Sequence, residues 1–204
     1  MFIWINRANQ LSSFVAAGLF LSACLPSGFD QIYDAQKPYV VLGGALRIAV
    51  PQGYCLDRSS LVTNGDTFVA LAGRCVEGTV YPAAVISIAV GPQGTAVDVA
   101  ENVDELISYF ETQNGLAALS AAENTPSITL ISAQVEKQAL LLHLKKHSAT
   151  KGGLQSDTWR AIVGLSGRLI TISISGRDGD ALTQAQGAAL LKKVISAMAQ
   201  SQTA

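Results

Sequence analysis

Two histidines and three cysteines are the side chains of this 204-residue chain best suited to hold a metal ion. One set combines thiolates with imidazoles, the donors that zinc prefers: Cys55, Cys75, His143 and His147. These residues are scattered along the sequence, whereas the ligands of zinc modules come in close pairs. We therefore expect no metal ion at these positions.

The two histidines lie four residues apart, a spacing at which two imidazoles on one helix bind a single ion. The leucines around them alternate instead, which is typical of a strand. On a strand, His143 and His147 would lie about 13 Å apart. We expect both on a solvated strand face, opposite a buried face made of Leu140, Leu142 and Leu144.

A nucleophilic serine is the next candidate for chemistry. Residues 164–167 read Gly-Leu-Ser-Gly, but a nucleophile elbow needs a glycine two positions after the serine, where this chain has Arg168. Ser166 also lies between two strand-like stretches, whereas the elbow joins a strand to a helix. We predict a hairpin turn there and assign no catalytic residue.

Acidic residues give no recognisable site either. Asp178 and Asp180 lack the further oxygen ligands of a calcium loop. Asp157 and Glu136 have no partner at the spacing expected of paired catalytic carboxylates. No glycine-rich segment continues into a phosphate-binding motif. We therefore expect no cofactor, although sites assembled from distant residues leave no local pattern.

Charge is sparse and balanced along the chain. Only 14% of the residues are charged, the formal net charge is -1, and the basic residues are dispersed. Nucleic-acid binding needs a basic patch that neutralises phosphates. We therefore expect no nucleic-acid partner.

The first 23 residues have the pattern of a targeting segment. Arg7 is the only charged residue in it, and the stretch from Leu11 to Ala23 contains no polar residue except three serines. A membrane-spanning helix needs roughly 20 apolar residues, so this stretch is short for a permanent span. The alternative to a targeting segment is a helix that belongs to the core of the folded protein.

The end of that stretch, Leu21-Ser22-Ala23-Cys24, resembles the lipobox of bacterial lipoproteins. The resemblance implies a signal peptide at residues 1–23 and a palmitate-bearing lipid on Cys24. It implies a location in the cell envelope, facing the periplasm, and Leu25 in place of Asp favours the outer membrane. A soluble periplasmic protein without the lipid is the alternative.

Lipid on Cys24 would leave two cysteines, Cys55 and Cys75. An exported protein meets oxidising conditions, so this pair is expected to form a disulfide. Closing a loop of that length would stabilise the fold by about 3 kcal/mol. The disulfide prediction therefore depends on the lipoprotein resemblance.

The rest of the chain has the size of one domain. Residues 24–38 contain proline, glycine and serine and are expected to form a tether, followed by one globular domain at residues 39–204. Hydrophobic alternation predicts strands at 46–50, 54–56, 68–72, 83–90, 128–135, 140–147, 159–163 and 169–175.

Two segments have helical periodicity instead. The first starts at Asp98, with Glu101 completing a capping box and Asn114-Gly115 as the stop signal. The second is an amphipathic helix from Leu182 to Met198. The order of elements predicts an α+β fold in which two main helices pack on an antiparallel sheet of about six strands.

This arrangement resembles the Mog1/PsbP-like fold, an α/β/α sandwich. The resemblance rests on the early strand ending in Pro-x-Gly-aromatic, the helix from Asp98, and the last hairpin running into a C-terminal helix. Members of that fold share no catalytic constellation, so the resemblance implies architecture and not activity.

The function expected from these observations is that of a lipid-anchored envelope protein that binds or scaffolds an envelope protein partner without catalysis. The alternative is an anchored or periplasmic hydrolase whose site is assembled from distant residues. A cleft that gathers His143, an acid and a hydroxyl group would favour the hydrolase.

Overall fold

The structure is a computed structural model that describes residues 37–120, 127–147 and 153–203. The expected signal peptide, Cys24 and most of the expected tether at residues 24–38 lie outside these ranges. Within them, no helix is both long and apolar enough to cross a membrane.

A seven-stranded antiparallel sheet forms the centre of the domain, in the order β3-β4-β5-β9-β8-β7-β6. It confirms the α+β prediction, with one strand more than expected. The strands are β3 (Tyr54–Asn64), β4 (Thr67–Arg74), β5 (Ala84–Gln93), β6 (Ile128–Glu136), β7 (Ala139–Lys146), β8 (Leu154–Leu165) and β9 (Arg168–Arg177).

The expected first strand of this sheet belongs to a separate small hairpin. Strands β1 (Tyr39–Val41) and β2 (Leu46–Ile48) pair with each other around the 3₁₀ turn η1 (Leu42–Gly44). The side-chain amide of Gln202 accepts a hydrogen bond from the Arg47 N–H at 3.1 Å and donates one to the Arg47 carbonyl at 2.7 Å. The hairpin is thereby held against the end of the last helix.

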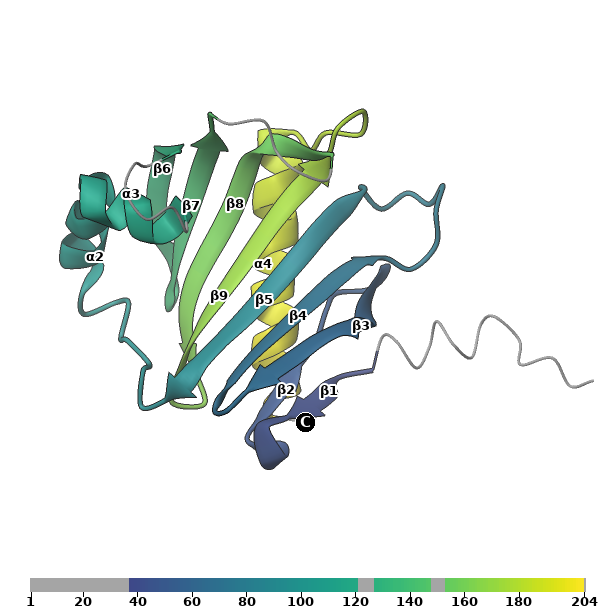
Figure 1. Cartoon of the computed structure of the whole chain (residues 1–204), viewed down its shortest axis with the longest axis horizontal. Helices are drawn as coiled ribbons and strands as arrows, with labels where there is room; N and C mark the ends of the chain where they lie inside the picture. Colours follow the sequence, from purple (N-terminus) through teal and green to yellow (C-terminus); the bar gives the residue numbers. More distant parts are fainter. Residues whose placement is uncertain (1–36, 121–126, 148–152, 204) are drawn as a thin grey trace, which may run out of the picture.

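Helices cover the sheet from both sides. Helix α4 (Gln184–Ser201) crosses one face, and α2 (Val103–Glu111) and α3 (Gln113–Ser120) lie on the other face at the β6–β7 end (Figure 1). On each face of the sheet, the helices bury a separate cluster of hydrophobic side chains. The α4 side is centred on Trp159, Ile172, Leu191, Val194 and Met198, and the opposite side on Phe110, Leu119, Leu140, Leu142 and Leu144.

The first of these helices begins later than the sequence predicts. The Asp98 carboxylate accepts the predicted hydrogen bond from the Glu101 N–H at 3.2 Å, but it caps a separate turn. Regular helix starts only at Val103, after Asn102. The predicted start at Asp98 is therefore wrong, because the residues that follow Asp98 form a single hydrogen-bonded turn and the α-helix begins after that turn.

The predicted stop at Asn114-Gly115 is also wrong, since both residues lie inside α3. A Cβ on Gly115 would lie 2.1 Å from the carbonyl oxygen of Tyr109. Glycine at this position lets α3 approach the end of α2 closely. The break between the helices occurs at Thr112, whose extended backbone ends α2.

The hairpin predicted around Ser166 is confirmed. Strands β8 and β9 are joined by Ser166 and Gly167, whose φ angles of 52° and 74° suit a tight hairpin turn. Ser166 therefore lies in a β turn and does not have the strand-to-helix geometry of a nucleophile elbow.

The predicted disulfide between Cys55 and Cys75 is present, with the two Cα atoms 5.0 Å apart. Cys55 lies on β3, and Cys75 directly follows β4. The Cys75 N–H also donates to the Gly53 carbonyl at 3.0 Å. The bridge thus fixes the end of the outermost hairpin of the sheet.

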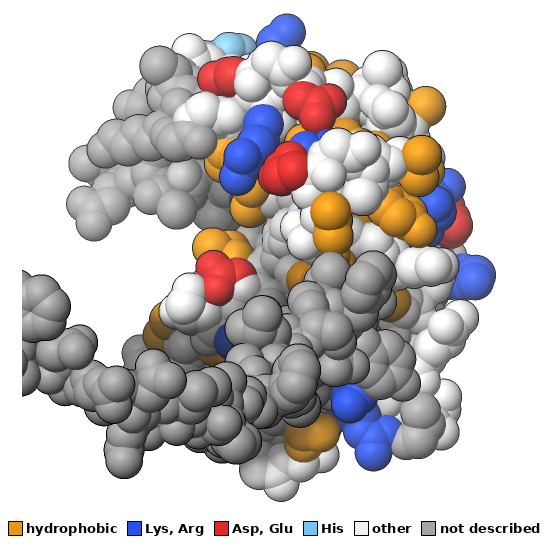
Figure 2. Space-filling view, turned by 90° about the vertical axis from the view of Figure 1, so that its right-hand side faces the viewer, with side chains coloured by type: hydrophobic (Ala, Val, Ile, Leu, Met, Phe, Trp, Pro, Cys, Tyr) orange, Lys and Arg blue, Asp and Glu red, His pale blue; other side chains and the backbone are white. Residues whose placement is uncertain are grey.

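The surface side chains show no large region of one sign in the view of Figure 2. In the upper part of this view, Lys and Arg side chains lie among Asp and Glu side chains, with hydrophobic side chains between them.

Candidate ligand-binding groove

The flank of α4 and the β6–β7 end of the sheet enclose a groove with two compartments, which we call the apolar and the polar compartment. Leu141 on β7 lines both of them. Helix α4 contributes the residues spaced along one of its sides: Gln184, Ala188, Leu191, Lys192, Ile195, Ser196 and Ala199. We call the whole depression the α4 groove.

Helix α4 is placed over the sheet by two local features. Thr183 and Gln186 form a complete capping box at its start. Gly187 then faces Trp159 so closely that a Cβ there would lie 2.1 Å from the indole ring. The absence of a side chain at Gly187 therefore lets α4 lie directly on the strand that carries Trp159.

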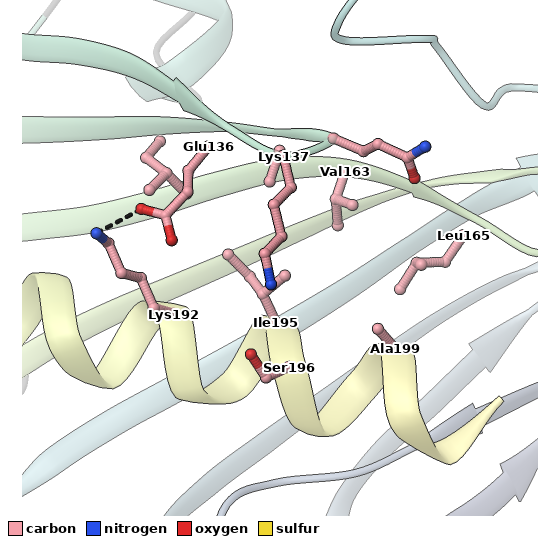
Figure 3. A pocket seen from close by; sticks show the side chains of 11 residues that line it. Glu136, Lys137, Val163, Leu165, Lys192, Ile195, Ser196 and Ala199 are labelled. Carbon is pink, nitrogen blue, oxygen red and sulfur yellow. Dashed lines mark ion pairs between the residues drawn. The ribbon is translucent and has the colours of Figure 1, made fainter. Parts of the chain in front are cut away.

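The apolar compartment has a volume of about 130 Å³ and lies between α4 and strands β7 and β8. Its walls are side chains of Ala, Val, Leu and Ile, contributed by Ala139, Leu141, Val163, Leu165, Ile195 and Ala199. Figure 3 shows Val163 and Leu165 on the sheet facing Ile195 and Ala199 on the helix. The compartment is thus suited to an apolar group.

Charged side chains stand at the edge of this compartment. Lys192 on α4 forms an ion pair with Glu136 at the end of β6, and both side chains are 44% exposed. Lys137 follows in the β6–β7 turn with a φ of 57° and extends toward Ile195 and Ser196 (Figure 3). Positive φ is uncommon for a lysine, and here it occurs in the turn that joins β6 to β7.

The polar compartment is organised by His143. Its Nε2 lies 2.8 Å from a carboxylate oxygen of Asp157 on β8. The imidazole also stacks on the indole of Trp159, with ring centroids 5.1 Å apart. The expectation of a solvated strand face at His143 is therefore wrong, because α4 covers this face and only 10% of the side chain is exposed.

Two nitrogen atoms of this stacked pair have no hydrogen-bond partner among the described residues. They are Nδ1 of His143 and Nε1 of Trp159, and both are buried. A buried polar atom without a partner costs about 1–3 kcal/mol. The compartment has a volume of about 40 Å³, which admits a group the size of one or two water molecules.

A hydroxyl group lies beside the histidine. Ser132 on β6 is paired in register with His143 and lines the same compartment. The structure thus gathers His143, an acid and a hydroxyl group on three neighbouring strands. Sequence reasoning found no partner for Asp157, since register across strands is set by folding and not by spacing along the chain.

His147 has a different environment from His143. It follows β7, and its Nε2 lies within hydrogen-bond distance of the Thr129 hydroxyl. Within the described ranges, no three His, Cys, Asp or Glu side chains are grouped so that they could hold a metal ion. Cys55 and Cys75 are joined to each other.

Other buried polar residues hold loops to the sheet. Arg168 donates to the Asp66 carboxylate at 2.6 Å and to the Gly91 carbonyl at 3.1 Å. Hydrogen bonds from Arg168 and from the Gln93 N–H keep the pKa of Asp66 below its usual value. These contacts fix the turn between β3 and β4.

Tyr54 is a second buried polar group with a structural role. Its hydroxyl donates to the Pro82 carbonyl at 2.9 Å. Burial raises the pKa of Tyr54 to about 12, against a smaller opposing effect of Arg74. The tyrosine therefore stays neutral, as expected of a core aromatic.

Comparisons with known proteins give only distant likenesses. No family model matches the chain, and no curated protein matches it. A crystal structure of a STAR-related lipid transfer protein from Xanthomonas axonopodis is similar at 10% identity and a TM-score of 0.32, over 75% of this chain and 100% of that one. A protein from Chromobacterium violaceum is similar at 10% identity and a TM-score of 0.25, over 84% and 86% of the two chains. Both likenesses are coarse.

Proposed function

We propose that the domain is a non-catalytic binding module and that the α4 groove holds a small ligand with an apolar body. The observation that carries this proposal is the apolar compartment, which the sheet and the helix enclose with aliphatic side chains. Burial of apolar surface gives the binding free energy, and the polar groups at the groove orient the ligand.

The size of the compartment limits the ligand. A dry protein cavity of about 150 Å³ is known to bind benzene. The apolar compartment is slightly smaller, at about 130 Å³. Pockets for drug-sized molecules are larger, about 300–1,000 Å³. The group bound here is therefore one aromatic ring or a short branched chain.

The proposal includes a location. The module is tethered to the envelope, facing the periplasm, by lipid on Cys24. The lipobox pattern supports this location, and the Cys55–Cys75 bridge agrees with an oxidising compartment. The likeness to the Mog1/PsbP-like fold stays a prediction alongside it, and so does an envelope partner.

Toluene is a suitable probe for the apolar compartment because it has no charge. We expect toluene to shift the methyl NMR signals of Leu141, Val163 and Ile195 in the purified chain. Ala199→Leu fills the edge of the compartment from an exposed position and should abolish the shifts.

Ala185→Leu is the matched control, since Ala185 is exposed on the same helix and lines none of the compartments of the groove. It should leave the shifts unchanged. Toluene shifts that survive Ala199→Leu, or no shifts in the unsubstituted chain, would rule out the apolar compartment as a binding site.

One observation favours hydrolysis as a second candidate function. The Asp157 carboxylate lies within hydrogen-bond distance of His143 Nε2, and His143 Nδ1 is buried without a partner among the described residues. Ser132 and His143 line the same compartment. A base oriented in this way can activate a serine hydroxyl. The space beside it admits only water-sized groups, so binding remains the better-supported function.

A fluorophosphonate probe distinguishes the two functions, because it labels only activated serines. A hydrolase should be labelled, and Ser132→Ala should abolish the labelling while Ser59→Ala, at an exposed site on β3, leaves it unchanged. Absence of labelling in the unsubstituted chain would remove this candidate.

A further inference from the structure

We infer that the ligand of the α4 groove is a free, small organic carboxylate. Its aryl or short acyl body occupies the apolar compartment, and its carboxylate lies between Lys137 and Lys192. This inference rests on the proposed function and adds to it the chemical class of the ligand.

The first support is the state of Lys137. Among the described residues, its ammonium group has no hydrogen bond or ion pair. The side chain nevertheless extends across the apolar compartment toward Ile195 and Ser196 (Figure 3). An unpaired ammonium group beside an apolar compartment is complementary to a ligand that combines an apolar body with a negative charge.

The second support is the Lys192–Glu136 ion pair at the same edge. Both partners are 44% exposed, and exposed ion pairs contribute little stability, about 0–1 kcal/mol. A carboxylate on the ligand can replace the Glu136 carboxylate at Lys192 without loss of a buried interaction. The existing pair thus shows that a carboxylate is accommodated at this position.

The charges at the edge also determine the sign of the ligand. Lys137 and Lys192 are cationic and Glu136 is anionic, so the lining of the compartment has one positive charge in excess. A monocarboxylate would neutralise this excess. A cationic ligand would face two ammonium groups, and a neutral one would leave Lys137 unpaired.

The small volume of the compartment limits the distance between the charge and the apolar body of the ligand. Leu141 and Val163 line the compartment from the sheet, whereas Lys192 lines it from α4 and Lys137 reaches across it from the β6–β7 turn. The carboxylate therefore has to be attached directly or within one or two bonds of the apolar body. Benzoate has this arrangement and the size of ring that the volume admits.

Three probes of similar size test the inference: benzoate, benzyl alcohol and benzylamine. Titration calorimetry on the purified chain at low salt should give the tightest binding for benzoate, about tenfold tighter than for benzyl alcohol, because hydrogen bonds to charged groups are the stronger ones. Benzylamine should bind most weakly. Added salt should weaken benzoate binding and leave benzyl alcohol binding unchanged.

Substitutions at the edge give a second test. Lys137→Gln should remove most of the preference for benzoate over benzyl alcohol. Glu136→Gln should strengthen benzoate binding, since it removes the carboxylate that competes for Lys192. Lys193→Gln is the matched control: it removes a neighbouring charge from α4, but Lys193 does not line the apolar compartment.

The outcomes separate this inference from the proposed function. If benzoate and benzyl alcohol bind equally and Ala199→Leu abolishes both, the groove binds apolar ligands and the inference of a carboxylate is wrong. If none of the three probes binds, the proposed function fails as well. A preference for benzoate that Lys193→Gln reduces as strongly as Lys137→Gln would also overturn the inference.

Discussion

The imidazole of His143 lies parallel to the indole of Trp159, with an angle of 9° between the ring planes. The two residues are paired in register on neighbouring strands, and Gly187 of α4 lies directly above the indole. Strands β7 and β8 and helix α4 thus meet at one stacked pair, which forms the end of the groove opposite the apolar compartment.

Gly187→Ala should destabilise the domain, because the new Cβ would lie 2.1 Å from the ring of Trp159. Overpacking of this kind costs about 1–3 kcal/mol. Urea denaturation measures the loss. Gly73→Ala serves as the control, since the nearest atom to a Cβ there is 3.8 Å away. Equal stability of Gly187→Ala and the unsubstituted chain would contradict the close approach of α4.

Reduction of the disulfide should lower stability. The bridge joins residues 20 positions apart, for which the chain-entropy relation gives about 3 kcal/mol. The double variant Cys55→Ser, Cys75→Ser should show this loss in denaturation curves, and reductant should have no additional effect on its stability. A thiol assay that detects free Cys55 and Cys75 in the unreduced chain would disprove the bridge.

Asp66 should contribute to the loss of stability in acid. Its pKa in the folded protein is below the ordinary value of 3.8 because Arg168 and Gln93 donate hydrogen bonds to it. Its contribution is therefore complete above pH 3.8 and disappears as the pH falls through the lowered pKa. Asp66→Asn should be less stable than the unsubstituted chain at neutral pH, and the gap should narrow toward pH 2. A gap that is constant with pH would exclude the contribution of this carboxylate.

Cys24→Ser tests the anchor. If lipid is attached at Cys24, the substitution should abolish palmitate labelling and release the protein from the membrane fraction. Cell fractionation together with labelling measures both. Persistence of both properties in the variant would show that lipid is not attached at this residue.

The antiparallel α+β architecture was predictable because alternation and helical periodicity are local signals. The hairpin at Ser166 and Gly167 is an example, since these two turn residues separate two stretches in which hydrophobic residues alternate with others. The helix boundaries were less predictable. Gly115 has the composition of a stop signal, but its role depends on the closeness of Tyr109, which is a tertiary contact.

The candidate site was largely hidden in the sequence. His143 was visible, but the face on which it lies becomes buried only when α4 covers the sheet. Its partner Asp157 is 14 positions away, and the partners Glu136 and Lys192 are further apart still. Such pairs follow from strand register and helix placement, which local periodicity does not specify.

Leu141 lines both compartments of the groove, so a ligand that displaces this side chain would couple the two compartments. A ligand in the apolar compartment that displaces this side chain changes the space beside His143. By linkage, a water molecule or ligand group bound beside His143 then alters affinity in the apolar compartment by the same factor. Cooperativity between two occupants would then depend on the side chain of this one leucine.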